Sequence, residues 1–196
     1  MVKAYYSDKA LVVDILTKAY DKNTSVNYLI KQDKKRLFRI KRLIEYSFET
    51  CWHFGEIYLS SDKKGVAFIL NPEKQKVTLR SIFLDLQLAV YSIGITNIVR
   101  VLKVERYKKM TRPKLHSYLY IWYIGVYPDY QGKGPAIELR NEIFALADKR
   151  QLPILIETTG EKHRNVYQHC GFELYHTWTI GQNIISYYFL LRQPKS

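Results

Sequence analysis

The chain has few cysteines and no long apolar run, and each shortage excludes a class of protein. Two cysteines, Cys51 and Cys170, are too few for a disulfide framework, and they show no metal-ligand spacing. No apolar run approaches the roughly 20 residues that a membrane-spanning helix needs. The opening residues, MVKAYYSD, lack the apolar core of a signal peptide. We therefore expect a cytoplasmic protein that does not span a membrane and holds no metal.

Acidic residues are scarce relative to basic ones. There are 18 Asp and Glu against 31 Lys and Arg, which leaves a net charge of +13. The excess is concentrated in residues 31–42 (KQDKKRLFRIKR) and 103–114 (KVERYKKMTRPK). Such segments can be solvated helix faces, or they can attract nucleic acid, an acidic membrane or a phosphorylated cofactor. Charge alone does not choose among these partners.

The remaining composition is that of a folded domain. Of the 196 residues, 47% are hydrophobic and 25% are charged, a balance typical of a chain with a buried core. No linker, repeat or low-complexity stretch interrupts it. We expect one domain over residues 1–196.

Apolar spacing predicts helices in the first half of the chain, at residues 8–20, 33–51, 76–91 and 97–110. The apolar stripe of the second helix predicts a core position for Cys51; it comprises Leu37, Ile40, Ile44, Phe48 and Cys51. Two short strands, 55–59 and 65–70, are expected to form a hairpin around the turn at 60–64.

The second half alternates strands and helices. The aromatic and β-branched run at 116–127 predicts a long strand, and residues 153–158 predict a short buried one. Residues 135–150 predict a helix whose inner face comprises Ile137, Arg140, Ile143 (or Phe144) and Ala147. The remaining predicted elements are a helix at 163–170 that Gly171 ends and two closing strands at 172–180 and 184–192. This order indicates an α/β domain with a mixed sheet.

The glycine-rich stretch GVYPDYQGKGPAIELRNEI at residues 125–143 joins the long strand to the helix that follows it. It is not a Walker A loop, because Gly132-Lys133 is followed by Gly134 instead of Ser or Thr. It also lacks the third glycine of a dinucleotide fingerprint. What remains is a strand, a turn and a helix N-terminus, whose free N–H groups and positive dipole suit a pyrophosphate. Pro135 fits the first turn of that helix.

The stretch resembles the acetyl-CoA-binding motif of the GCN5-related N-acetyltransferases, Q/R-x-x-G-x-G/A, with Gln131, Gly134 and Ala136 at its fixed positions. The resemblance covers residues 117–172 and includes the strand exit Val-x-Pro and the later Tyr-x-x-x-Gly-Phe, here residues 167–172. It implies one domain with a mixed, mostly antiparallel sheet flanked by helices. A helical insertion would precede the cofactor-binding strand, and the cofactor-binding core would span about residues 116–172.

The resemblance further implies acetyl-CoA as cosubstrate and direct attack by a primary amine in a ternary complex. A backbone N–H near Val126, where the strand splays from its neighbour, would polarise the thioester, and Gly125 is consistent with a bulge there. Two residues depart from the family pattern: Pro135 in the loop, and His163 where the family often carries Asn. The cofactor-binding residues implied are Ile124, Gly125, Val126, Gln131, Gly132, Lys133, Gly134, Pro135, Ala136, His163 and Asn165.

Two residues are candidates for the proton transfers. Tyr167, placed by its motif, is the candidate general acid for the departing thiolate, although a tyrosine there also fits core packing. Glu157, at the end of a strand, is the candidate base if burial raises its pKa, and a structural role fits equally well. His116 and His53 are weaker candidates for the base.

The acceptor is expected to be a small-molecule or peptide amine, and a homodimer is one option for the assembly. Two other functions stay open. The same fold can bind acyl-CoA as a sensor without turnover. A nucleic-acid-binding module would use the basic helices, although no aromatic and basic stacking signature or zinc module supports it.

Overall fold

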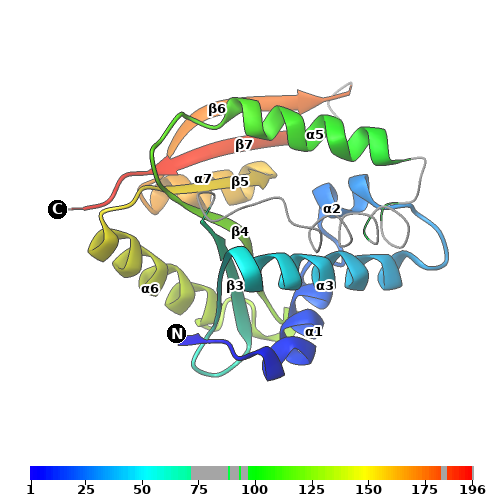
Figure 1. The fold of residues 1–196 in the computed structure, drawn as a ribbon, viewed down its shortest axis with the longest axis horizontal. Coiled ribbons are helices and arrows are strands. Elements are labelled where there is room, and N and C mark those ends of the chain that lie inside the picture. Colours follow the sequence, from blue (N-terminus) through cyan, green and yellow to red (C-terminus); the bar gives the residue numbers. More distant parts are fainter. Residues whose placement is uncertain (72–87, 89–92, 94–96, 182–184, 196) are drawn as a thin grey trace.

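The computed structural model describes residues 1–71, 88, 93, 97–181 and 185–195. Its helices are α1 (Lys9–Ala19), α2 (Thr24–Leu29), α3 (Arg36–Phe54), α5 (Ile98–Thr111), α6 (Pro135–Arg150) and α7 (Glu161–His169). Its strands are β1 (Val2–Lys3), β2 (Gly55–Leu59), β3 (Gly65–Leu70), β4 (Leu119–Val126), β5 (Ile154–Thr159), β6 (Glu173–Ile180) and β7 (Ile185–Arg192). They form one sheet in the order β1-β2-β3-β4-β5-β7-β6 (Figure 1). Among the pairs of neighbouring strands, β4 and β5 are parallel and the others antiparallel. The predicted mixed, mostly antiparallel sheet is confirmed.

Helices cover both faces of the sheet, because β3 sends alternate side chains to opposite sides. Val66 and Phe68 belong to the core that α1 and α3 complete, whereas Ala67 and Ile69 belong to the core that α6 completes. Figure 1 shows α6 on one side of β3, with α1 and α3 on the other. Val104 of α5 packs on β7, next to Tyr187 and Phe189. The sheet therefore carries α6 and α7 on one face and α1, α3 and α5 on the other.

The elements that were predicted within the described residues lie within a few residues of their predicted bounds, whereas β1 and α2 were not predicted. Cys51 is fully buried in the core, as predicted. Leu37 was wrongly assigned to the buried stripe: it is exposed, because it lies in the first turn of α3, before the buried positions begin at Ile40. The buried positions of α6 include Leu139, which was not predicted, and exclude Ile137, which was. Most of the predicted helix at 76–91 lies outside the described residues. No helix in the described part of the chain is long and apolar enough to cross a membrane.

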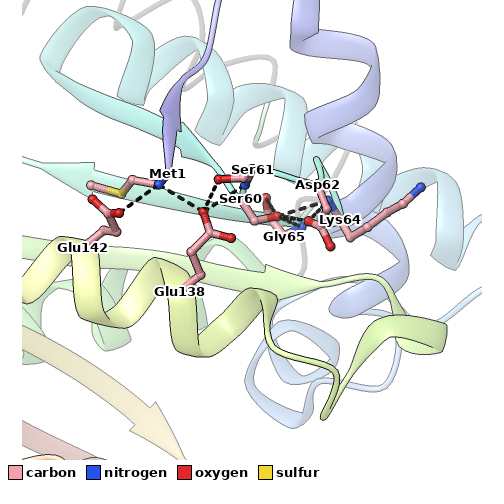
Figure 2. A network of polar contacts seen from close by, with 8 residues as sticks. All are labelled: Met1, Ser60, Ser61, Asp62, Lys64, Gly65, Glu138 and Glu142. Carbon is pink, nitrogen blue, oxygen red and sulfur yellow. Dashed lines mark hydrogen bonds and ion pairs between the residues drawn. The ribbon is translucent and has the colours of Figure 1, made fainter.

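A polar network fixes the N-terminal turn of α6 to the hairpin between β2 and β3 (Figure 2). Glu138 accepts hydrogen bonds from the backbone N–H of Ser61, at 2.9 Å, and from its hydroxyl, at 2.6 Å. The same carboxylate lies 3.0 Å from the amino group of Met1. Ser60 shapes the hairpin from inside, since its hydroxyl oxygen accepts the N–H of Gly65 at 2.8 Å. The start of α6, and with it the glycine loop, is thus held against the sheet.

Candidate active site

The sheet divides between its two parallel strands. β4 and β5 pair only through residues 119–121 and 154–156. Beyond that point β4 continues with β3 to Val126, and β5 continues with β7 to Thr159. In Figure 1, β3 and β4 run down the centre while β5 and β7 run across the upper part. The splay predicted near Val126 is confirmed, and we call the gap between residues 122–126 and 157–159 the wedge.

The bulge in β4 does not lie at Gly125, where it was expected. The register shifts opposite Phe68 and Ile69, so that Trp122 is the extra residue, while Gly125 pairs regularly. Gly125 is explained by close packing instead. A Cβ at this position would lie 2.8 Å from Cδ2 of Leu16 on α1, closer than carbon atoms pack.

A cavity of about 560 Å³ passes through the wedge, a size typical of small-molecule sites. On one face it is lined by α6 and α7, through Ala136, Ile137, Arg140, Phe144, Val166, Tyr167 and Cys170. On the other face it is lined by residues of α2, α3 and α5. Ile137 and Arg140, which were predicted to face the core, line this cavity instead, so that side of α6 faces the wedge.

The glycine loop lies at the α6 end of this cavity, where Gln131 and Ala136 line it. Gly132 and Gly134 have φ of +77° and +111°, values that side chains rarely adopt. Among the described residues, no acceptor bonds the N–H groups of Gly132, Gly134 or Ala136, and all three precede or begin α6. Free donors at a helix N-terminus bind anions well. The ammonium of Lys133, the residue between the two glycines, lies 5.6 Å from the centroid of the Tyr130 ring.

The backbone of β4 alternates between β3 and the wedge. The N–H of Tyr127 donates to the carbonyl of Lys64, the residue before β3, so the backbone of Tyr127 faces β3. Because the direction alternates along the strand, the N–H and C=O groups of Ile124 and Val126 face the wedge. At Ile124 the hydroxyl of Tyr20 takes the place of a strand partner: it donates to the carbonyl at 3.1 Å and accepts the N–H at 3.3 Å. The N–H of Val126 faces the wedge further along. Sequence reasoning missed Tyr20, which follows α1 in an ordinary helical pattern.

Tyr167 lies where its motif placed it, on the cavity wall of α7. Its ring contacts that of Phe172 edge-on, with 5.5 Å between centroids. No hydrogen bond from its hydroxyl to another described residue is present, and burial raises its pKa. The phenol is therefore protonated and unpaired at the cavity, the state that a general acid requires.

Glu157 also lines the cavity, but the expectation that burial raises its pKa is wrong. Its carboxylate accepts hydrogen bonds from Nε of Arg112 at 2.8 Å and from the hydroxyl of Tyr120 at 2.7 Å, and Nζ of Lys108 lies 3.6 Å away. Burial alone would raise the pKa, but Lys108 and Arg112 outweigh it, so the pKa lies below its ordinary value. Glu157 is thus ionised and already paired, a poor arrangement for a base.

The other predicted residues are dispersed. His163 lines the cavity, with Nδ1 3.1 Å from the carbonyl of Thr159. Asn165 does not line it, and its side chain accepts hydrogen bonds from the neighbouring Arg164. Neither His116 nor His53 lines the cavity. Within the described residues, no group of His, Cys, Asp and Glu could hold a metal ion.

A splayed mixed sheet with a glycine loop at the start of the helix after β4 defines a class: the chain has the fold of the GCN5-related N-acetyltransferases. No family model matches the chain. A histone acetyltransferase HPA2 and related acetyltransferase of Corynebacterium glutamicum is similar in structure, with a TM-score of 0.71 and 17% identity, over 100% of this chain and 96% of that one. Arylalkylamine N-acetyltransferase 2 of Aedes aegypti is similar with a TM-score of 0.63 and 16% identity, over 99% and 98%.

One curated protein is similar in sequence. An uncharacterised N-acetyltransferase of Schizosaccharomyces pombe is 40% identical over 57 residues, which are 29% of this chain. The match spans 23% of the length of that protein.

A third similar structure is the ribosomal-protein-S18-alanine N-acetyltransferase of Escherichia coli. It shares the fold with a TM-score of 0.54 and 10% identity, over 100% of this chain and 93% of that one.

Proposed function

We propose that the protein transfers an acetyl group from acetyl-CoA to a primary amine by direct attack in a ternary complex. The observation that carries this proposal is the cavity through the wedge, which connects the glycine loop on one face to a chamber on the other. A coenzyme held at the loop reaches the wedge from the α6 face, and an amine reaches it from the α5 face. Two substrates that meet in one gap need no covalent intermediate on the protein.

The groups around the wedge can account for coenzyme binding, for stabilisation of the oxyanion and for protonation of the leaving thiolate. The amides of Gly132, Gly134 and Ala136 would bind the pyrophosphate, because they are free donors at a helix N-terminus. The N–H of Val126 faces the wedge and would stabilise the oxyanion that forms as the amine attacks. Tyr167 would protonate the departing thiolate.

Glu157 has a different role in this proposal from the one its sequence position indicates. Since its pKa is lowered by Lys108 and Arg112, it does not take the proton from the attacking ammonium. It holds α5 over the sheet, because both cations belong to that helix or the residue after it. The ammonium proton would pass to water in the cavity.

A pair of glycine substitutions tests the coenzyme site. Gly134 and Gly171 both have positive φ, +111° and +88°, and a Cβ at either would contact nothing within 4 Å. Gly134→Ala and Gly171→Ala should therefore lose similar stability, about 1–2 kcal/mol each. Only Gly134 lies in the loop, so only Gly134→Ala should weaken acetyl-CoA binding, by about tenfold or more in calorimetry. Equal affinity in the two variants would refute the assignment of the loop.

Turnover is measured separately, by release of free thiol from acetyl-CoA in the presence of primary amines. Tight coenzyme binding without thiol release from any amine would mean that the fold serves as a sensor. Binding to duplex DNA at physiological salt, unaffected by Gly134→Ala, would instead indicate a nucleic-acid-binding protein.

A further inference from the structure

The half of the cavity away from the glycine loop has a distinct lining, and we call it the acceptor chamber: the part bounded by α2, α3, α5 and the facing strands. Its described walls are mainly apolar or aromatic, and they include Val26, Leu29, Leu43, Tyr46, Val101 and Trp122. Apolar walls contribute affinity in proportion to the apolar surface that a ligand buries. A ligand of this chamber therefore has an apolar body.

Charge is confined to one side of the chamber, beneath α5. Of the described residues that line the whole cavity, only Glu105 and Glu157 are acidic. Both oxygens of Glu157 are occupied, by Arg112 and by Tyr120. Glu105 is less fully paired: its Oε1 accepts a hydrogen bond from Nζ of Lys108 at 3.3 Å, no described residue bonds its second oxygen, and its side chain is 44% exposed. Glu105 thus supplies a carboxylate oxygen for a cationic ligand.

A second polar group on the same side lacks a partner. The hydroxyl of Tyr187 is buried and makes no hydrogen bond to any described residue, although the side chain, 2% exposed, lines the cavity. A buried hydroxyl without a partner is costly, and a ligand group can supply the missing bond. Tyr187 pairs with Thr159, at the edge of the wedge. Its side chain lies beneath α5, since Nζ of Lys108 is 5.2 Å from the centroid of the Tyr187 ring.

We infer that the acceptor is a primary monoamine on an apolar body of aromatic or branched alkyl type, with its amino group held by Glu105 and Tyr187. This inference rests on the proposed acetyltransferase function and specifies its substrate class. A polyamine would bring a second ammonium to walls whose remaining described carboxylate, Glu157, is already paired. An amino acid would bring a carboxylate next to Glu105, and Lys108 is already shared between Glu105 and Glu157.

The experiment compares amines that differ in one property, at saturating acetyl-CoA with thiol release as the readout. Phenethylamine has the inferred form, phenylalanine adds a carboxylate to it, and spermidine adds further ammonium groups. We expect kcat/KM for phenethylamine to exceed the other two by about tenfold or more. A preference for spermidine or phenylalanine, or equal rates for all three, would overturn the inference. Acetyl-CoA binding without acceptor is measured alongside, so that failure of the acceptor class is distinguished from failure of the acetyltransferase function.

Two variants test the residues. Glu105→Gln should raise KM for phenethylamine by about tenfold, with kcat and acetyl-CoA affinity nearly unchanged. Glu173→Gln, an exposed carboxylate on β6, is the matched control and should leave KM unchanged. Tyr187→Phe removes only a hydroxyl without a partner, so it should raise KM without lowering the thermal midpoint. An unchanged KM in both Glu105→Gln and Tyr187→Phe would show that neither residue contacts the amine.

Discussion

Replacing Glu157 with glutamine distinguishes a structural carboxylate from a catalytic base. The substitution keeps the shape of the side chain but removes its charge, which leaves Arg112 without this counter-ion and Lys108 with Glu105 alone. Glu157 is 3% exposed and Arg112 is 14% exposed, so water replaces the lost charge poorly. Removing one partner of a buried ion pair costs about 3–5 kcal/mol. Because the cations are not completely buried, we expect the lower end, a loss of about 3 kcal/mol in the free energy of unfolding.

Glu56 offers a matched control with the same kinds of partner. It accepts two hydrogen bonds from Arg150, at 2.9 and 3.0 Å, and another from Tyr58. It is 17% exposed and Arg150 is 36% exposed, so this pair lies closer to solvent. Glu56→Gln should therefore cost about 1 kcal/mol or less. Urea unfolding at neutral pH measures both losses.

The stability difference between wild type and Glu157→Gln should also depend on pH, in a direction that the pKa of Glu157 sets. The pKa of Glu157 in the folded protein lies below its ordinary value of 4.5, so its stabilising effect is complete above pH 4.5. The effect is lost as the pH falls through the folded-state pKa, and there the difference between wild type and Glu157→Gln should shrink. The structural assignment would be refuted by a variant as stable as wild type whose kcat falls about a hundredfold and whose acidic limb in the pH–rate profile disappears.

Two further substitutions follow from the geometry of the wedge. Tyr167→Phe keeps the contact with Phe172 but removes the hydroxyl, so kcat should fall by about ten- to a thousand-fold at unchanged acetyl-CoA affinity; an unchanged kcat, with chemistry limiting, would show that Tyr167 only packs. Gly125→Ala introduces a Cβ 2.8 Å from Leu16 and 3.0 Å from Ala19, so unfolding should become easier by about 1–3 kcal/mol. An unaltered urea midpoint for Gly125→Ala would mean that α1 has more room than its packing indicates.

Features that depend on neighbours in the chain could be predicted from the sequence. The hairpin at 55–70 and the glycine loop have turn residues and strand or helix patterns side by side, and both form as predicted. Features that depend on distant residues could not. Glu157 meets Arg112 across 45 positions, and Tyr20 meets Ile124 across 104. The residues next to Glu157 in the sequence do not indicate that cations lie beside it. A pKa predicted from burial alone was therefore wrong, because Lys108 and Arg112 lower it.

The same separation explains the basic segments. Arg36 and Arg39 bond to Asp21 and Asp33, and Lys108 lies inside the cluster around Glu157. Some of the basic residues in these segments are therefore paired with carboxylates of the same protein. A count of basic residues cannot separate those from the ones that face solvent.

The division between β4 and β5 gives the molecule a seam. Across the middle of the sheet, strand pairing connects the two halves only through residues 119–121 and 154–156. Anything that occupies the wedge touches both halves and supplies the cohesion that strand pairing omits there, much as an added strand would. Because a ligand stabilises the state to which it binds, substrates bound in the wedge would, under the proposed function, stabilise the folded sheet for as long as they stay bound. Under the proposed function, the bound substrates would hold the two halves of the sheet together, and departure of the products would end that added stabilisation.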